Sequence, residues 1–315
     1  MTEEKKLVTI ICPLYNEEKC VLLFYNRLSA VLETQSHKYD FELICMNNRS
    51  TDSTLDLLKK LREQDDRIQI LTLSRNFGYQ ASVQAGLSHA SGEAMIVVDA
   101  DCEDPPELIP QFLEKWEAGY DVVYGLRKDR QDVWIIKKGR NMFYRLLRLT
   151  ADMDIILYMA EFALISSNVR NAVINNQNTF PFIRSEIGYA GFNRYGIPYT
   201  REQRIGGKTH YHLYHLFSFG AAGILTASTF ILRLAAYMLP FFVILNIVGI
   251  VSILWGDNKA VFPALVVVDF LYTVFLLTFL CIYQARIYKN AIGRPLYIVD
   301  PNLSYIKENS LFKKG

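Results

Sequence analysis

The chain has 315 residues, a formal net charge of +2 and five cysteines. This length gives room for one large domain and an additional segment, while the small net charge selects no class of partner. No basic cluster with interleaved aromatic residues stands out as a nucleic-acid site, so we expect no nucleic-acid partner. The cysteines form no Cys-x-x-Cys pair and no zinc-binding spacing, which indicates a reducing compartment and argues against a disulfide framework.

Short apolar runs alternate with segments of helical periodicity through the N-terminal part of the chain. The apolar runs predict strands at Leu7–Cys12, Phe41–Met46, Ile68–Leu73, Ala94–Val98 and Val122–Tyr124. Apolar residues at helical spacing predict helices at Glu18–Glu33, Ser50–Arg62, Tyr79–Ala90 and Pro106–Ala118. This alternation predicts an α/β fold with a mostly parallel sheet and helices on both faces.

Two long apolar segments follow, at Leu234–Trp255 and Ala260–Tyr283. Each is long enough to cross a hydrocarbon core of about 30 Å as a helix, and two buried helices of a large soluble core are the alternative. Cations gather outside this hairpin, at Arg233, Arg286, Lys289 and Arg294. Because positive charge favours the cytosolic side, we expect two transmembrane spans with both ends in the cytosol.

The chain is thereby divided into a cytosolic domain at 1–210, interfacial helices at 211–232, two transmembrane helices at 233–285 and a cytosolic tail at 286–315. The second region mixes aromatics, histidines and small residues, as interfacial helices do, and a packing helix of the soluble domain is the alternative. A basic, aromatic helix is expected at Lys137–Thr150. Asn246 and Asp269 inside the spans indicate a contact within the hairpin or between subunits, or a hydrophilic path.

The most informative polar residues follow the fourth apolar run, which ends in Asp99 and Asp101. A buried parallel strand delivers such side chains to the C-terminal edge of its sheet, where open α/β folds bind ligands. Two carboxylates there suit a hard divalent cation, and such a cation suits a diphosphate. An acidic turn after a strand is the alternative.

The segment Asp99-Ala-Asp-Cys-Glu-Asp-Pro-Pro-Glu107 resembles the Asp-Ala-Asp-x-Gln-Asp-Pro-Pro-Glu pattern of family 2 glycosyltransferases of the polyisoprenyl-phosphate type, such as bactoprenol glucosyltransferases. Other segments that resemble this family are Pro13-Leu-Tyr-Asn-Glu17, Ser74-Arg-Asn-Phe-Gly78 and Gly293-Arg-Pro-Leu-Tyr297. The resemblance spans residues 7–299 and is weakest at 155–198. It implies a GT-A-type fold that binds a nucleotide-sugar.

The resemblance also implies the roles of individual residues. Asp101 would be the main ligand of Mg²⁺ or Mn²⁺, with Asp99 and Glu103 beside it. The positions matched to nucleotide-sugar binding are Pro13, Tyr15, Glu17, Asn48, Asp99, Ala100, Arg127 and Arg204. For Arg127, a surface arginine is the alternative. The positions matched to the lipid phosphate or donor diphosphate are Arg201, Arg204 and His210, the last replacing a family lysine. A basic loop against anionic lipid head groups is the alternative for this last set.

Several positions depart from the family pattern. Asn47 and Asn48 stand at family aspartates, and Arg49 stands at a family glycine. The amide oxygen of Asn48 can still accept a hydrogen bond from the base, without charge assistance. Glu161 fills the position of the aspartate that deprotonates or orients the acceptor, and Ala163 stands at a family arginine. Because a phosphate acceptor is already ionised near neutral pH, Glu161 acts as a base or only positions the metal or acceptor.

The resemblance therefore implies a membrane-anchored, metal-dependent, inverting glycosyltransferase in a bacterial plasma (inner) membrane. It would move one sugar from a nucleotide-sugar, with UDP-sugars favoured, to a polyisoprenyl phosphate such as undecaprenyl phosphate. A homo-oligomer, for example a tetramer, is expected. The alternative is a catalytically weak scaffold or partner of a lipid-sugar flippase or downstream transferase. It is motivated by five departures at or near functional positions: Asn47, Asn48, Glu161, Ala163 and His210. A processive polysaccharide synthase is disfavoured because its Gln-x-x-Arg-Trp signature is absent.

Overall fold

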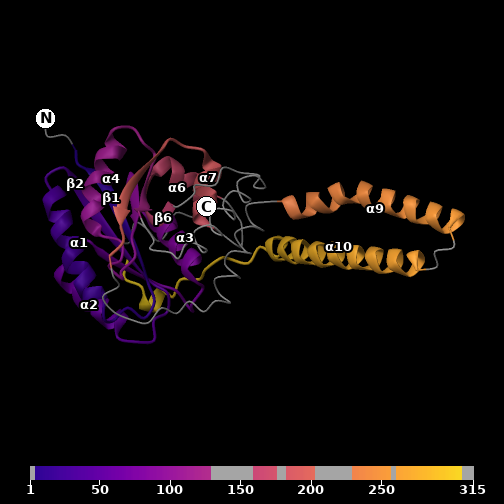
Figure 1. Ribbon diagram of the computed structural model, residues 1–315. Helices are drawn as coiled ribbons and strands as arrows, with labels where there is room; N and C mark the ends of the chain where they lie inside the picture. The colour runs from indigo at the N-terminus through magenta and orange to yellow at the C-terminus, as the bar shows by residue number, and fades with distance from the viewer. Residues whose placement is uncertain (1–3, 129–158, 176–181, 203–228, 257–259, 307–315) are drawn as a thin grey trace.

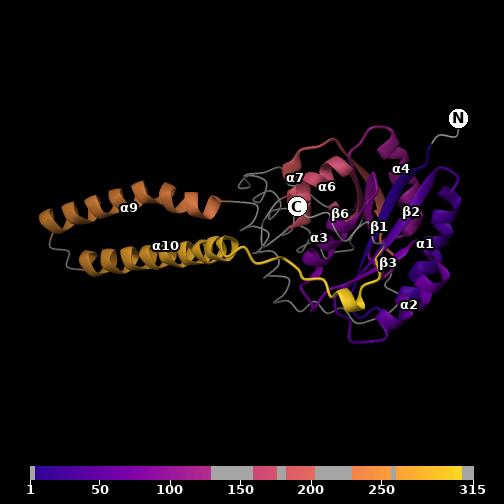
Figure 2. The ribbon, with the colours of Figure 1, turned by 180° about the vertical axis from the view of Figure 1, so that it is seen from behind.

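The computed structural model describes residues 4–128, 159–175, 182–202, 229–256 and 260–306. Figure 1 shows a layered α/β domain and a long helical hairpin that projects away from it. The view from behind in Figure 2 shows the same separation. The apolar C-terminal segments therefore build a structure apart from the core of the sheet.

The strands of the described residues form one sheet in the order β3-β2-β1-β4-β6-β5-β7. They are β1 (Lys6–Leu14), β2 (Tyr39–Asn47), β3 (Ile68–Thr72), β4 (Ala94–Val97), β5 (Val122–Lys128), β6 (Met159–Ser166) and β7 (Arg194–Thr200). Among them, β6 runs antiparallel to β4 and β5, and the other neighbouring pairs are parallel. The predicted α/β class with a mostly parallel sheet is confirmed.

The strand order reverses next to β1. The chain runs outward from β1 to β2 and β3, and then returns to place β4 on the other side of β1. Such a reversal is the point where open α/β sheets bind ligands, at the carboxyl ends of the strands. The loop that begins at Tyr15 and the segment that begins at Asp99 leave these two adjacent parallel strands at the same edge.

Helices cover both faces of the sheet, and each face has its own apolar core. One face packs against α1 (Val21–Gln35), α2 (Thr54–Gln64) and α4 (Ile109–Glu117), which follows the 3-10 turn η1 (Pro106–Leu108). The other face packs against α3 (Tyr79–His89), α6 (Ser167–Ile174) and α7 (Ile183–Ala190). Successive residues of a strand point to opposite faces, so Ile10 belongs to the first core and Ile11 to the second.

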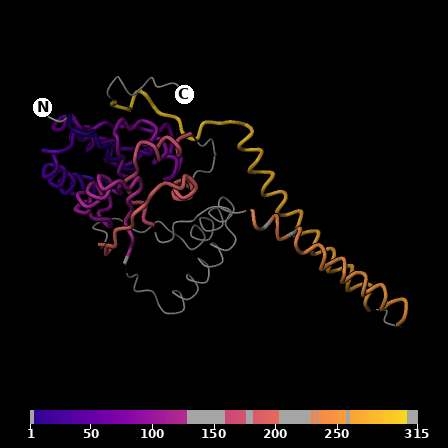
Figure 3. Tube along the Cα trace, turned by 90° about the horizontal axis from the view of Figure 1, so that it is seen from above, coloured from indigo at the N-terminus to yellow at the C-terminus, as the bar shows by residue number. Residues whose placement is uncertain are grey.

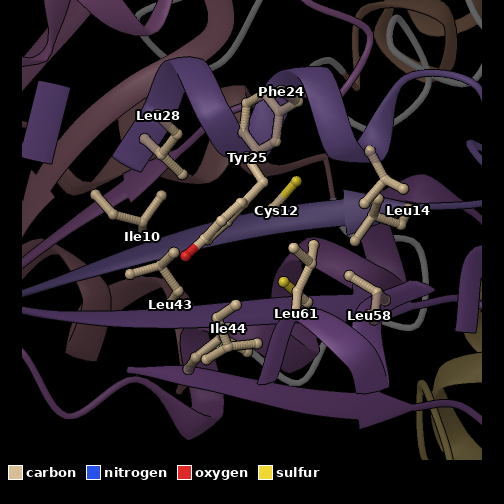
Figure 4. Close-up of a pocket in the computed structure, with 13 residues that line it drawn as sticks. Ile10, Cys12, Leu14, Phe24, Tyr25, Leu28, Leu43, Ile44, Leu58 and Leu61 are labelled. Atoms are coloured by element: carbon tan, nitrogen blue, oxygen red, sulfur yellow. The ribbon is translucent and has the colours of Figure 1, made fainter. Parts of the chain in front are cut away.

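A small cavity of about 20 Å³ lies in the first core, between β1, β2, α1 and α2. Figure 4 shows its apolar lining, with the Tyr25 ring reaching across it. The Tyr25 hydroxyl donates to Asp65 over 2.9 Å. Cys12 and Cys45 also line the cavity, and burial raises the pKa of Cys45 to about 12, so this thiol stays protonated. An apolar void of this size is a packing feature and has no room for a nucleotide.

The approach of α3 to the sheet depends on two glycines. Gly78 precedes the helix with φ at +91°, a conformation that side chains with a Cβ rarely adopt. A Cβ at Gly86 would overlap the Ile11 side chain of β1. Small residues therefore allow α3 to lie close to the sheet, and they set the depth at which its first residues meet the strand ends.

The hairpin consists of α9 (Phe230–Trp255) and α10 (Val261–Ala291). The stretches Leu232–Trp255 and Val261–Ala291 have mean hydropathies of 2.3 and 2.5 and are long enough to cross a membrane. Only 6% of the residues in the apolar part of α9, and 0% in that of α10, are buried in the structure. These helices are therefore not core helices of the α/β domain. Their apolar side chains face outward, for example Leu254 at 75% exposure.

The two hairpin helices contact each other through three successive pairs. Phe242 stacks on Tyr272 with ring centroids 4.0 Å apart. The Asn246 side chain donates to Asp269 Oδ1 over 3.0 Å. A Cβ at Gly249 would overlap the Leu265 side chain, so the helices also touch closely there. Asn246 and Asp269 thus make a contact within the hairpin, one of the outcomes that the sequence left open.

After α10 the chain returns to the α/β domain as a strap over residues 292–306, which contains the 3-10 turn η2 (Pro301–Leu303). Backbone bridges join Val299 to Leu73 and Tyr305 to Ile70 at the free edge of β3. Arg49 Nη1 bonds Asp300 Oδ2 over 2.9 Å. The strap therefore covers the outer sheet edge and touches the loop that follows β2.

Several boundaries differ from the predicted ones. β5 and α10 are longer than predicted, because each continues beyond its apolar run as a regular element. The segment 155–198, in which no element was predicted, contains β6, α6, α7 and most of β7. The expected helix at 137–150 and residues 211–228 of the expected interfacial helices lie outside the described residues.

Candidate active site

Three carboxylates gather at the carboxyl edge of β4. Asp99 and Asp101 follow this strand, and Glu161 lies near the start of the neighbouring β6. The antiparallel pairing of Ile96 with Leu164 and Val97 with Ala163, continued by two residues, places Asp99 beside Glu161. Both Asp101 and Glu161 act electrostatically on Asp99. The fold therefore brings together residues that are far apart in sequence.

Asp99 is the most strongly perturbed of these groups. Burial and the neighbouring charge of Asp101 raise the pKa of Asp99 to about 7. The Tyr79 hydroxyl donates to Asp99 Oδ1 over 2.8 Å and partly offsets this rise. A carboxylate held among like charges is a site where a divalent cation is favourable.

The other two predicted metal ligands, Asp101 and Glu103, lie in the turn after Asp99 and have other partners. Cys102 has φ at +58°, and the Glu103 amide donates to Asp101 Oδ1 over 3.1 Å. The Glu103 carboxylate forms an ion pair with Arg201. Carboxylate oxygens match the preference of Mg²⁺ and Mn²⁺, but the described residues contain no group of three His, Cys, Asp or Glu side chains arranged around a metal position. The carboxylates of Asp101 and Asp99 are of the ligand type that such a cation prefers.

Asp104 is the buried centre of an ion-pair network behind this turn. Its carboxylate is fully buried and accepts from Arg127 Nη2 over 3.2 Å and from the Tyr199 hydroxyl. Arg127 Nε also donates to the Tyr199 oxygen over 3.1 Å, and Arg201 Nε lies 3.8 Å from Asp104 Oδ1. Arg127 is 19% exposed in this network, so the surface-arginine alternative is wrong.

The predicted nucleotide loop follows β1. Pro13 is buried at the end of this strand, whereas the Tyr15 side chain is 45% exposed. The Glu17 amide donates to the Thr54 hydroxyl over 2.9 Å, which ties the loop to the start of α2. Asn16 Oδ1 accepts from the Thr51 amide over 2.8 Å. The loop is therefore anchored at its backbone, with an aromatic ring left at the surface.

The two asparagines at the end of β2 hold loops together. Asn48 is 4% exposed; its Nδ2 donates to Asn76 Oδ1 over 3.0 Å and its Oδ1 accepts from the Phe77 amide over 3.0 Å. Asn47 Oδ1 accepts from the Ser50 amide over 3.0 Å. Both asparagines are therefore engaged with the protein, and Asn48 keeps a second lone pair on Oδ1 and a second N–H on Nδ2 that could meet a base.

Backbone strain concentrates at the same edge. The non-glycine residues with positive φ in the described chain are Asn16, Arg49 and Cys102, at +56°, +61° and +58°. They lie in the loops after β1, β2 and β4, which meet at the topological switch point. Such conformations cost on the order of 1 kcal/mol each and concentrate at functional sites.

Comparison with known proteins agrees with this geometry. The sequence model for glycosyl transferase family 2 matches residues 9–174. The chain belongs to glycosyl transferase family 2. It is 34% identical over 310 residues to the uncharacterized glycosyltransferase YkcC of Bacillus subtilis, covering 96% of this chain and 95% of that protein.

This family 2 glycosyltransferase is also 30% identical over 305 residues to the SfII prophage-derived bactoprenol glucosyl transferase of Shigella flexneri, covering 93% of this chain and 97% of that protein. Among solved structures, it is similar to mannosyltransferase PcManGT of Pyrobaculum calidifontis in complex with GDP-Man and Mn²⁺. That similarity has a TM-score of 0.46 at 15% identity and covers 92% of this chain and 87% of that one.

Four of the predicted site residues of the glycosyltransferase are buried, paired with another side chain or outside the described residues. Ala100 is 2% exposed and packs in the first core, so only its backbone can face a ligand. Arg204 and His210 lie outside the described residues. Arg201 lies at the edge and pairs with Glu103.

Five residues at the site were not predicted from the sequence: Tyr79, Gln80, Asp104, Arg184 and Tyr199. Asp104 could have been found, since it lies within the same acidic segment as Asp99. The other four come from α3, α7 and β7, and no local pattern distinguishes them from ordinary surface or core residues. Their place at the site is set by how α3, α7 and β7 pack against the ends of the strands.

Proposed function

We propose that this glycosyltransferase moves one sugar from a nucleotide-sugar to a polyisoprenyl phosphate. We propose a UDP-sugar as the donor and undecaprenyl phosphate as the acceptor. The observation that carries the proposal is the convergence of Asp99, Asp101 and Glu161 at the edge of the sheet where β4 ends and the antiparallel β6 begins. The 30% identity to a bactoprenol glucosyl transferase over 93% of this chain supports a lipid-phosphate acceptor.

In the proposed reaction, an oxygen of the acceptor phosphate attacks C1 of the sugar from the side opposite the diphosphate. The bond from C1 to the diphosphate oxygen breaks, its electron pair leaves with the nucleoside diphosphate, and the anomeric configuration inverts. The acceptor is already ionised near neutral pH, so no proton has to be removed from it. We therefore assign Glu161 to orienting the acceptor.

Asp101 and Asp99 are the residues that we propose to hold Mg²⁺ or Mn²⁺. Such a cation, when bound, offsets the charge that develops on the leaving diphosphate. Arg127 and Arg201 converge on the buried Asp104, and we propose that this network fixes the turn carrying Asp101. Tyr15, exposed at the end of β1, is proposed to contact the nucleotide.

We propose that α9 and α10 anchor the enzyme in the plasma membrane, with the α/β domain in the cytosol. The two helix ends that connect to the domain lie on the domain side of the hairpin, as Figure 3 shows. Arg233 and Lys289 lie near these ends, as expected for the cytosolic side. This arrangement brings the sugar donor in the cytosol to a phosphate at the bilayer surface. The single chain does not test the predicted homo-oligomer, which stays a prediction.

The test is to incubate the purified full-length protein with undecaprenyl phosphate, Mn²⁺ or Mg²⁺, and a panel of labelled nucleotide-sugars. A lipid-linked sugar is the expected product, and its identity names the donor. Asp101→Ala is expected to abolish the product, whereas Asp56→Ala on the exposed face of α2 is the matched control that keeps it. Glu161→Gln separates orientation from proton removal, because an amide can still accept a hydrogen bond but cannot take a proton.

Absence of product with every donor, from protein that unfolds cooperatively, would contradict the proposal. The scaffold alternative would then be tested by binding of UDP and GDP in the presence of Mn²⁺ or Mg²⁺. Metal-dependent binding without transfer would point to a different acceptor, whereas no binding of either nucleotide would favour a protein that acts through partners.

A further inference from the structure

Arg184 forms a two-point contact with Glu161. It lies in the first turn of α7, and its Nη2 and Nε bind Glu161 Oε1 at 2.7 and 2.8 Å. Glu161 is 13% exposed and Arg184 is 29% exposed, so the pair is largely withdrawn from water. Both nitrogens converge on the same oxygen, and within the described part of the chain Oε2 accepts no hydrogen bond. The contact thus fixes the orientation of the carboxylate and offsets its charge.

Gln80 holds the same carboxylate and the start of the same helix. Its Nε2 lies 3.4 Å from Glu161 Oε1, and its Oε1 accepts from the Ile183 amide over 2.9 Å. The amides in the first turn of a helix have no partner within the helix, so this bond satisfies one of them. One side chain of α3 therefore links Glu161 to the helix that carries Arg184.

The geometry also explains how the site accommodates an alanine at position 163. Ala163 lies two residues after Glu161 on β6, on the same face of the strand. A cavity of about 10 Å³ at this point is lined by both residues and by Arg184. The cation that the family pattern carries on the strand is missing, and a cation from α7 reaches the carboxylate instead.

We infer that Arg184 is a positioning residue for the acceptor, acting through Glu161, and that Gln80 keeps α7 in the place this requires. The inference rests on the proposed function, because it assumes that an anionic phosphate approaches Glu161. Asp99, Asp101 and Asp104 already concentrate negative charge nearby. Pairing Glu161 with a guanidinium presents the phosphate with a neutral unit, whereas an unpaired carboxylate would repel it.

The inference predicts a selective defect in Arg184→Met. The kcat/KM for undecaprenyl phosphate is expected to fall about 10- to 100-fold, the range typical for residues that orient a ligand, while the KM for the nucleotide-sugar stays within about twofold. Arg184→Lys keeps the charge but not the two-point contact, so an intermediate rate is expected. Gln80→Leu is expected to shift the same parameter in the same direction by a smaller factor.

A double-variant cycle decides whether Arg184 acts through Glu161. If it does, Arg184→Met has little further effect on the acceptor kcat/KM in a Glu161→Gln background. An equal fold-loss in both backgrounds, or an unchanged acceptor kcat/KM in Arg184→Met, would overturn the inference. Arg170→Met in α6 is the matched control, since Arg170 is a partly buried arginine bonded to the Ala90 carbonyl, and no change in the acceptor parameters is expected from it.

Thermal unfolding of the same four proteins gives a second readout that does not need catalysis. Arg184→Met is expected to lower the Tm more in the wild-type background than with Glu161→Gln, because it leaves a buried charge only in the first case. Equal Tm losses in both backgrounds would contradict the pairing itself. A wild-type protein without product would overturn the proposed function, whereas a wild-type protein with product and an additive kinetic cycle would overturn only the role of Arg184.

Discussion

The two halves of the carboxyl edge of the sheet use different chemistry. Where β1, β2 and β3 end, four neutral amides hold the loops beside charged residues such as Glu17 and Arg49: Asn16, Asn47, Asn48 and Asn76. Where β4 ends and the antiparallel β6 begins, carboxylates gather: Asp99, Asp101, Asp104 and Glu161. The amides bond one another and nearby backbone amides, as Asn48 does with Asn76. The paired carboxylates require cations from other elements, as Asp104 does with Arg127.

This difference shows how one edge serves two tasks. The buried amides Asn47 and Asn48 are satisfied by neutral hydrogen bonds, so they need no counter-charge of their own. Buried carboxylates are costly unless they are paired, so the second half needs arginines, a tyrosine and, as we propose, a divalent cation. The neutral half suits an uncharged base, and the charged half suits a diphosphate.

The largest effect is expected at Asp104. Asp104→Ala leaves the guanidinium of Arg127, which is 19% exposed, without its carboxylate, and such a loss typically costs about 3–5 kcal/mol. Chemical denaturation monitored by fluorescence should show this loss in the free energy of unfolding. Asp56→Ala, with a carboxylate 75% exposed, is the control expected to change it by less than about 0.5 kcal/mol. A loss below about 1 kcal/mol for Asp104→Ala would show that the network contributes little to stability.

A pH-dependent effect is expected at Asp99. Its pKa is raised from the usual 3.8 to about 7, so folding favours the protonated form. The stability contributed by this proton is complete below about pH 4 and is lost as the pH rises toward 7. In metal-free protein, Asp99→Asn should therefore be more stable than wild type at pH 8, by about 1–2 kcal/mol after allowance for partial exposure, and about equally stable near pH 4.

Thermal or chemical unfolding at the two pH values measures this difference. Tyr79→Phe removes the hydroxyl that donates to Asp99 and should destabilise the protein more at pH 8 than near pH 4. An Asp99→Asn gain of equal size at both pH values would mean that ionisation of Asp99 is not its cause.

A smaller loss is expected when the neutral half receives a charge. Asn48→Asp replaces a donor facing Asn76 Oδ1 by an acceptor at a site that is 4% exposed, which should cost about 1–3 kcal/mol. The loss should be greater at pH 8 than near pH 4, because burial disfavours the carboxylate. Titration with UDP measures separately whether the added charge strengthens binding of the base. Unchanged stability would show that the amide network tolerates charge.

The smallest effect is expected at Arg49, where two contributions oppose each other. Arg49→Gly relieves the strain of a φ of +61° but loses the ion pair with Asp300. In this pair the Arg49 side chain is 44% exposed and that of Asp300 is 21% exposed. Each contribution is about 1 kcal/mol or less, so the net change in unfolding free energy should stay within about 0.5 kcal/mol. Asp300→Asn alone should cost about 0.2–1 kcal/mol, and this cost should vanish in the Arg49→Gly background. A persistent cost would assign Asp300 a role in the strap instead.

The periodicity of the sequence determined much of the architecture. Strands β1–β5 and the hairpin could be predicted because each is a local run of apolar residues at a regular spacing. The segment Asp99–Glu107 was recognisable because its acidic residues are contiguous. β6 and β7 were missed. β6 lies inside the sheet between two antiparallel neighbours, and β7 contains a proline and a glycine among its alternating exposed and buried residues.

The charge partners were decided by the tertiary structure alone. Arg184 and Glu161 are 23 residues apart on a helix and a strand, and Arg49 and Asp300 are 251 residues apart, so no local spacing connects either pair. Likewise, the sequence showed that Asn48 replaces an aspartate, but only the fold showed that its amide is bonded to Asn76 and Phe77. Apolar periodicity acts within one element and is legible in sequence, whereas an ion pair depends on how distant elements pack, and that is set by the folded chain as a whole.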